Sequence, residues 1–422
     1  MLSFGYLSFG GFTVTKANAV IGQSGGPTCA INATLAGVID ALQKSDKISK
    51  IFGTVNGING ILSGNLKELN KIFDNKENLS LLKNTPSSYL GSCRFKLPEF
   101  DENSEIYEDI FASLKKHNIK YFFYIGGNDS MDTVMKLNAY AKKFNKEVTV
   151  MGIPKTIDND LFGTDHCPGF GSAAKYVAAS VAEIARDAYC YFVDSVTIVE
   201  IMGRNAGFLT AASALARSEN LCAPDLIYLP ERPFDVNEFL SDVKDKIKKH
   251  KNVIVAVSEG IKNKDGVYIA AASDVLQNDK FGHAQLGGAA KTLENIVKTE
   301  IGCKCRSIEI NVLQRAASHF ASKTDLAESF KIGRTAVSYA LRGVSGEMMI
   351  FEREESENYK IKISSMDINL IANKEKTLPE NFINARGNDV TKAFINYARP
   401  LILGEEKIKT KDGIPVHLVL KR

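Results

Sequence analysis

Short apolar runs alternate with longer helical stretches along most of the chain. The apolar runs are rich in valine, isoleucine and aromatic residues, which is typical of strands buried on both faces of a sheet. Because predicted strands and helices alternate almost throughout, the sequence predicts an α/β fold with mainly parallel sheets. The predicted strands are 17–22, 51–55, 121–125, 148–151, 196–201, 226–229, 253–257, 306–312 and 348–351. The predicted helices are 30–42, 131–144, 172–188, 208–216, 235–250, 289–299 and 324–341.

Two of the predicted strands end in paired glycines and then enter a helix. Gly25 and Gly26 follow the first strand, and Gly126 and Gly127 follow strand 121–125. Glycines let the backbone approach an anion closely, and the amides at a helix start face it, so this arrangement can bind phosphate. Paired glycines are also ordinary turn residues, and the P-loop spacing is absent from the sequence, so the motif alone leaves both interpretations open.

The loop after strand 148–151 has the densest set of reactive side chains. Pro154 disfavours a helix, so the chain is expected to leave the sheet extended, and Lys155, Asp158 and Asp160 follow. Two residues apart in an extended chain, the carboxylates are expected to point to the same side. One can then take a proton while the other helps to hold a metal ion. The alternative is a surface turn rich in Asp and Asn.

Other charged residues also follow predicted strands. Asp129 comes after the second pair of glycines, and Arg204 and Glu259 each stand just beyond a strand. Ligands of open α/β sheets bind beyond the carboxyl ends of the strands, so this repeated placement favours a common site. An arginine at such a turn suits a phosphate or transition-state contact. The alternative role of Asp129 is to cap the start of a helix. The alternative for Arg94, which follows a polar segment, is an ordinary surface charge.

Composition narrows the class of protein. The 422 residues suffice for two or more domains, and 44% hydrophobic with 24% charged residues is an ordinary globular profile. The net charge of +4 is small and gives no reason to expect that the protein binds nucleic acid. The seven cysteines are odd in number and lack paired CxxC spacing, which argues against a zinc site. They favour a reducing, cytoplasmic location. No apolar run reaches the length of a membrane span, and residues 1–16 are predicted to be a poorly ordered extension, not a signal peptide.

Several motifs together resemble those of the phosphofructokinase family. They are SGGPTCAINATLAG at 24–37, GGNDS at 126–130, PKTIDND at 154–160, MGRNAG at 202–207 and PERPF at 230–234. The resemblance covers residues 18–345 in consistent order, and it implies two Rossmann-like lobes with the active site between them. The domains it implies are a phosphoryl-donor lobe at 17–165, a fructose 6-phosphate lobe at 166–315, and C-terminal helices and a strand at 316–422 that pack back on the lobes.

The resemblance implies phosphoryl transfer to the 1-hydroxyl of fructose 6-phosphate. Asp158 matches the base that takes the hydroxyl proton, and the other residues with implied catalytic roles are Lys155, Asp129 and Arg204. The residues that match sugar-phosphate contacts are Thr156, Ile157, Asp158, Met202, Gly203, Arg204, Glu259, Arg306 and Arg315. In the family, one of the two arginines that hold the 6-phosphate normally reaches across a subunit interface. The resemblance therefore implies a homodimer or homotetramer, which the sequence does not distinguish.

The phosphoryl donor is indicated by two positions within this resemblance. The donor contacts that it implies are Gly25, Gly26, Arg94, Lys155 and Asp129. ATP-using members are similar to one another in carrying glycine where this chain has Lys155 and Asp129. A carboxylate at 129 would fill the space of a nucleotide α-phosphate and repel it. Lys155 supplies a cation for the transferring group, in a contact worth about 1.5–3 kcal/mol. Together they imply inorganic pyrophosphate and a reversible reaction.

The implied cofactor is Mg²⁺, at a site that departs from the family pattern. The residues implied as ligands are Asn128, Asp129 and Asp160, with Asn128 standing where the family usually has Asp. Neutral Asn is the weaker Mg²⁺ ligand, so Asp129 or water is expected to carry more of the site. This divergence keeps an ATP-dependent phosphofructokinase as an alternative. A non-catalytic sugar-phosphate-binding subunit is the other, but a missing base would favour it and Asp158 is present.

Overall fold

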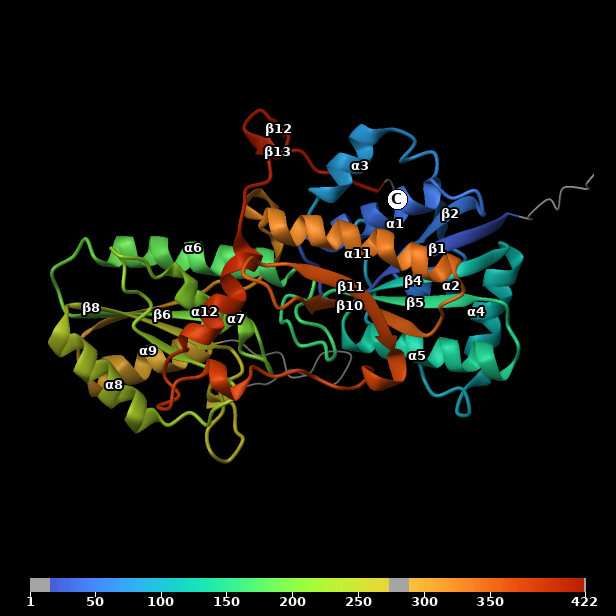
Figure 1. The fold of residues 1–422 in the computed structure, drawn as a ribbon. Coiled ribbons are helices and arrows are strands. Elements are labelled where there is room, and N and C mark those ends of the chain that lie inside the picture. Colours follow the sequence, from blue (N-terminus) through green and yellow to red (C-terminus); the bar gives the residue numbers. More distant parts are fainter. Residues whose placement is uncertain (1–15, 273–287, 421–422) are drawn as a thin grey trace, which may run out of the picture.

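Two lobes lie side by side in the molecule, and segments from the end of the chain run across both (Figure 1). The structure is a computed structural model that describes residues 16–272 and 288–420. The prediction of a poorly ordered extension at 1–16 concerns residues outside this range, Lys16 excepted. Both lobes have α/β architecture with mainly parallel strands, which confirms the predicted fold class.

The first lobe is built on a seven-stranded sheet with the order β11-β10-β5-β4-β1-β2-β3. The five inner strands are parallel, while β3 and β11 are antiparallel at the two edges. The strands are β1 (Ala17–Gln23), β2 (Ile48–Thr54), β3 (Leu66–Glu68), β4 (Ile119–Gly126), β5 (Thr149–Pro154), β10 (Glu347–Arg353) and β11 (Ile361–Asp367). Because β1, β4 and β5 are parallel neighbours, the loops that follow them meet at one edge of the sheet.

A four-stranded parallel sheet with the order β7-β8-β6-β9 forms the second lobe. Its strands are β6 (Ser195–Ile201), β7 (Leu226–Tyr228), β8 (Asn252–Ser258) and β9 (Lys304–Glu309). The predicted strand 306–312 therefore ends early, at Glu309, because Val312 stands in an exposed turn and Leu313 begins a short helix. A short hairpin of β12 (Thr410–Lys411) and β13 (Ile414–Pro415) stands apart from both sheets.

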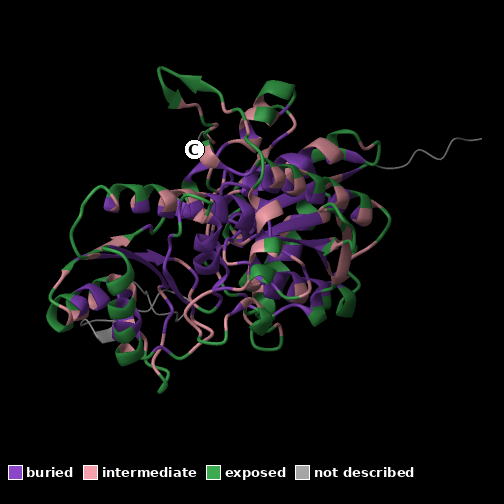
Figure 2. Ribbon diagram, turned by 60° about the vertical axis from the view of Figure 1, so that its left-hand side comes forward, coloured by how far each residue is buried: buried purple, intermediate pink, exposed green. Residues whose placement is uncertain are grey.

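Helices cover both faces of the sheets, with their buried residues turned inward and their outer faces exposed (Figure 2). In the first half of the chain they are α1 (Ile31–Gln43), α2 (Ile58–Leu62), α3 (Lys76–Lys83), α4 (Ser104–Lys116), α5 (Asn128–Lys143) and α6 (Phe170–Ala188). The rest are α7 (Phe208–Ala212), α8 (Val236–Lys249), α9 (Ala289–Glu300), α10 (Leu313–Ala316), α11 (Lys323–Leu341) and α12 (Lys392–Ala398). The predicted helix 208–216 is divided, since α7 gives way to a 3₁₀ turn at Ser213–Ala216.

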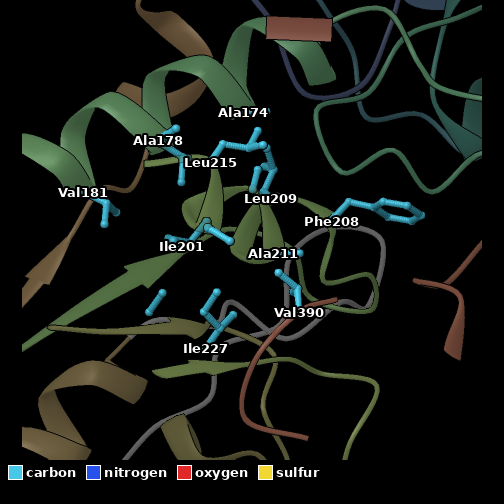
Figure 3. Packing of buried hydrophobic residues seen from close by; sticks show 14 of the residues in the cluster. Ala174, Ala178, Val181, Ile201, Phe208, Leu209, Ala211, Leu215, Ile227 and Val390 are labelled. Atoms are coloured by element: carbon cyan, nitrogen blue, oxygen red, sulfur yellow. The ribbon is translucent and has the colours of Figure 1, made fainter. Parts of the chain in front are cut away.

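Segments after residue 316 contribute to both lobes. Helix α11 crosses α1 so closely that a Cβ on Gly37 would lie 2.0 Å from the carbonyl oxygen of Phe330. Strands β10 and β11 extend the first sheet, whereas Val390 and the α12 residue Phe394 belong to the apolar core of the second lobe. Figure 3 shows Val390 among the side chains of that core, beside Ala211. The end of the chain therefore ties the two lobes together.

Candidate active site

Loops from both lobes line a cavity of about 290 Å³. Its walls are formed mainly by the turns that follow β1, β4, β5, β6 and β8, as expected for ligand sites in parallel sheets. The lining residues are Gly25, Gly26, Pro27, Thr28, Arg94, Gly127, Asn128, Asp129, Ser130, Lys155, Thr156, Ile157, Asp158, Asp160, Met202, Arg204, Asn205, Ala206, Glu259, Arg315 and Glu375. The cavity thus brings together all of the predicted site residues except Gly203 and Arg306.

Lys155 is buried at the edge of the first sheet and faces the first glycine turn. Its side chain is only 2% exposed, and Nζ donates a hydrogen bond to the carbonyl oxygen of Gly26 at 2.6 Å. The turn needs glycine, because Gly25 has a φ of +77° and a Cβ there would lie 3.2 Å from the Lys155 ammonium. Burial lowers the Lys155 pKa to about 8, although Asp158 and Asp160 oppose that shift. The cation is thus held close to the cavity by a hydrogen bond to a carbonyl oxygen.

Asp158 and Asp160 both line the cavity, so the alternative of a solvated surface turn is wrong. Burial raises the pKa of Asp158 to about 6, with a further contribution from the charge of Glu259. Burial and the neighbouring Asp158 raise the pKa of Asp160 to about 7. Carboxylates crowded together in a poorly solvated site resist ionisation in this way.

The backbone between these carboxylates is not simply extended. Asn159 has a φ of 59°, the left-handed region that Asn tolerates better than most residues. Its side chain is fully buried and turned away from the cavity, where its Oδ1 accepts a hydrogen bond from the Cys167 amide at 2.9 Å. Both carboxylates line the same cavity, and the residue between them is left-handed with an anchored side chain instead of extended.

Oxygen-bearing side chains gather where α5 begins. Asn128 donates from Nδ2 to Asp160 Oδ2 at 3.2 Å, while its Oδ1 is buried without a hydrogen-bond partner among the described residues. Asp129 is exposed in the first turn of α5. The N-cap of this helix is Gly127 and makes no side-chain cap bond, so the alternative role of Asp129 as the cap is not observed. In the ranges 16–272 and 288–420, no cluster of three or more His, Cys, Asp or Glu residues is able to hold a metal ion on its own.

The opposite wall comes from the second lobe. The Gly203 amide donates to Glu259 Oε1 at 3.2 Å, and the Gly203 carbonyl accepts from Ser258 Oγ at 2.7 Å. These bonds join the turn after β6 to the end of β8 and direct Arg204 and Glu259 to the cavity. The Arg204 Nε is buried and has no hydrogen-bond partner in the described part of the chain. Burial raises the pKa of Glu259 to about 7.

The two arginines predicted for the 6-phosphate lie apart. Arg315 lines the cavity, and burial together with the charge of Arg94 lowers the pKa of its guanidinium. Arg306, on β9, is nearly half exposed and its Nη1 lies 3.4 Å from Asp187 Oδ2. It lines a separate small hollow that also contains Ser195. Within one chain, Arg306 therefore does not reach the other predicted site residues.

Glu375 is a lining residue that the sequence did not reveal. The Asn205 Nδ2 donates to Glu375 Oε2 at 3.1 Å, and the Lys376 amide donates to the Asp160 carbonyl at 2.7 Å. A C-terminal segment thus touches the loops of both walls. It lies in a charged tail without regular periodicity, so the sequence offers no signal for it. Thr28, Ser130 and Ala206 were also missed, although they stand inside the quoted motifs.

Comparison with known proteins defines the family. The family model described as "Phosphofructokinase" matches residues 18–309, more than half of the chain. The chain belongs to the phosphofructokinase family. This confirms the resemblance drawn from the motifs of the glycine turns and the 154–160 loop.

Curated relatives match this phosphofructokinase over nearly its whole length. It is 41% identical to the pyrophosphate–fructose 6-phosphate 1-phosphotransferase of Xanthomonas campestris pv. campestris, with 97% of each chain covered. Identity to the enzyme of the same name from Methylococcus capsulatus is 39%, with 96% of each chain covered. A pyrophosphate-dependent phosphofructokinase from Nitrosospira multiformis has a similar crystal structure, with a TM-score of 0.86, 38% identity and 96% of each chain covered. Among the described residues, no helix has the length and apolar character needed to cross a membrane.

Proposed function

We propose that this phosphofructokinase transfers a phosphoryl group from inorganic pyrophosphate to the 1-hydroxyl of fructose 6-phosphate. The products are fructose 1,6-bisphosphate and phosphate, and the reaction runs in both directions. The names of the Xanthomonas and Methylococcus relatives support this activity. The observation that carries the proposal is the buried Lys155 ammonium, held at the cavity wall opposite the first glycine turn.

Lys155 and Asp129 together favour pyrophosphate over a nucleotide. Phosphoryl transfer depends mainly on positioning and charge neutralisation, and a cation held 2.6 Å from the Gly26 carbonyl supplies both near the glycine turn. Pyrophosphate satisfies this cation with its own oxygens and has no base or ribose to accommodate. ATP would have to carry its α-phosphate and ribose past the Asp129 carboxylate at the start of α5. Like charges at that point raise the free energy of nucleotide binding.

Asp158 acts in this proposal as the base that takes the proton of the 1-hydroxyl. Its burial and its position on the cavity wall support this role, because they supply a carboxylate of raised pKa where we expect the acceptor to bind. A base whose pKa lies near the working pH is well matched to proton transfer. Arg204 comes from the opposite wall, and its buried Nε, which has no partner among the residues that the structure describes, is a donor suited to the transferring phosphoryl oxygens.

The oxygen donors beside α5 fit a magnesium ion. Mg²⁺ usually takes one or two carboxylates together with substrate phosphates and water, so a protein cluster of three acidic groups is not required. The groups that would hold the ion are the carboxylates of Asp129 and Asp160 and the Oδ1 of Asn128, which has no hydrogen-bond partner within the described ranges. When bound, Mg²⁺ neutralises charge on the phosphoryl donor.

The sugar site is completed, in our proposal, by a second copy of the chain. Within its own chain, Arg306 lies outside the cavity and pairs with Asp187. Its side chain is exposed, so a neighbouring copy of the chain can contact it. Arg315 then binds the 6-phosphate from within the chain and Arg306 from the partner, which makes the enzyme a homodimer or homotetramer. We place this small-molecule enzyme in the cytoplasm.

A comparison of donors tests the proposal. The purified protein should phosphorylate fructose 6-phosphate with pyrophosphate and Mg²⁺ far faster than with ATP. Asp129→Gly should begin to admit ATP, because it removes the carboxylate that opposes the α-phosphate. A wild-type protein that clearly prefers ATP would overturn the assignment of the donor.

A further inference from the structure

The side of the catalytic loop that faces away from the cavity is attached to a C-terminal helix. Asn159 stands between Asp158 and Asp160, and its Nδ2 donates to the Tyr397 hydroxyl of α12 at 2.8 Å. That hydroxyl in turn donates to the Asp165 carbonyl oxygen at 2.8 Å. The phenol therefore closes a bridge between two points of the loop that contains the proposed base.

Asn159 transmits this attachment to the carboxylates. Its amide is held at both ends, by Tyr397 at Nδ2 and by the Cys167 amide at Oδ1. Its backbone is in the left-handed region, so the side chain and the φ of 59° are fixed together. Because Asp158 and Asp160 flank this residue, a rotation of its backbone would move both carboxylates relative to the cavity.

Tyr397 is itself held firmly. The Arg353 Nη1 donates to the Tyr397 carbonyl oxygen at 3.0 Å, and the guanidinium carbon lies 4.7 Å from the centre of the phenol ring. The same arginine pairs with the carboxylate of Asp165, with 3.0 Å between Nη2 and Oδ2. The ring also packs with Phe382 and Phe394 of the second-lobe core. The hydroxyl that meets Asn159 is thus positioned by both lobes.

We propose that Tyr397 is a positioning residue for phosphoryl transfer, and that it acts through Asn159 to aim the carboxylate of Asp158 at the acceptor hydroxyl. The inference rests on the proposed function, because it assumes that Asp158 is the base. It gives the C-terminal region a task in the reaction, although α12 contributes no side chain to the cavity.

Tyr397→Phe tests this role, because it removes the hydroxyl and keeps the ring. Displacement of a reacting group by about 1 Å costs up to about 100-fold, so kcat should fall about 10- to 100-fold with KM for both substrates nearly unchanged. Tyr359→Phe is the matched control. The guanidinium carbon of Arg353 also lies 4.9 Å from the centre of the Tyr359 ring. The Tyr359 hydroxyl donates to Glu328 at 2.8 Å, whereas the side chain of Asn159 is bonded to Tyr397 and Cys167. Tyr359→Phe should lose comparable stability and keep kcat.

A second variant separates positioning from general loss of stability. Asn159→Gly tolerates the left-handed backbone but loses both side-chain bonds, so its kcat should fall at least as far as that of Tyr397→Phe. The double variant should then be no slower than Asn159→Gly alone, since Tyr397 acts through Asn159. A normal kcat in Tyr397→Phe, a loss that Tyr359→Phe shares, or additive losses in the double variant would overturn the inference. Failure of the proposed base is recognised separately, because Asp158→Asn would then remain active.

Discussion

The two walls of the cavity differ in how much of a binding site one chain provides. The donor wall is formed by the turns after three neighbouring strands of one sheet. Two of these turns are joined by the hydrogen bond from Lys155 to the Gly26 carbonyl. The sugar wall comes from the second sheet, and one of its predicted phosphate ligands, Arg306, pairs instead with Asp187 on an exposed surface. Recognition of the donor is therefore built into the folding of the first lobe. Recognition of the sugar phosphate, in our account, also depends on assembly.

The largest effect is expected where the two walls meet. Asp158→Asn keeps the size of the side chain and removes the proton acceptor, so kcat should fall by about 10²–10⁴-fold. Binding of fructose 6-phosphate, measured by calorimetry, should persist because the sugar wall is intact. If turnover stays near normal, the proton is taken elsewhere and the division of roles between the walls is wrong.

A change confined to the donor wall should spare the sugar. Lys155→Gly removes a charge-assisted contact worth about 1.5–3 kcal/mol, so turnover with pyrophosphate should fall about 10- to 160-fold. The KM for fructose 6-phosphate should change little. Lys374→Ala, at an exposed lysine outside the cavity, is the control and should leave the kinetics unaltered. An equal rise in KM for both substrates would show that the walls are not independent.

Mixed oligomers test whether the sugar wall is shared. Arg306→Ala should raise the KM for fructose 6-phosphate about tenfold through loss of one phosphate contact. When this variant is refolded together with Asp158→Asn, some cavities combine an intact Asp158 with an intact Arg306 from the partner. Those cavities should regain a low KM. The shared site would be contradicted if the mixture showed only the sum of the activities of the two variants. A fully active monomer, detected by sedimentation at the assay concentration, would contradict it as well.

The smallest effect is expected in the pH dependence. Asp158 must be ionised to accept a proton, so kcat/KM should rise as pH increases through about 6. Lys155 must be protonated to bind the donor, so activity should fall as pH increases through about 8. In Lys155→Arg the alkaline limb should move to higher pH while the acid limb stays. If the alkaline limb does not move in this variant, the fall in activity at high pH is due to a group other than Lys155.

The sequence predicted the parts of the fold that repeat a strong pattern. Strand 121–125 and the loop from Pro154 to Asp160 were found because apolar runs and clustered polar groups are visible in short windows. The elements between 56 and 118, including α4, were missed because their apolar residues are interrupted by polar segments. Glu375 and Tyr397 could not be predicted, since their roles depend on contacts between residues more than 150 positions apart in the sequence.

The most direct test of the account follows phosphorus through the reaction. Phosphorus NMR of the purified enzyme with Mg²⁺, fructose 6-phosphate and pyrophosphate should show one phosphate formed for each fructose 1,6-bisphosphate. The same enzyme supplied with fructose 1,6-bisphosphate and phosphate should form pyrophosphate, since no nucleotide cleavage drives the reaction. Pyrophosphate that remains unchanged while ATP is consumed under matched conditions would contradict the central claim.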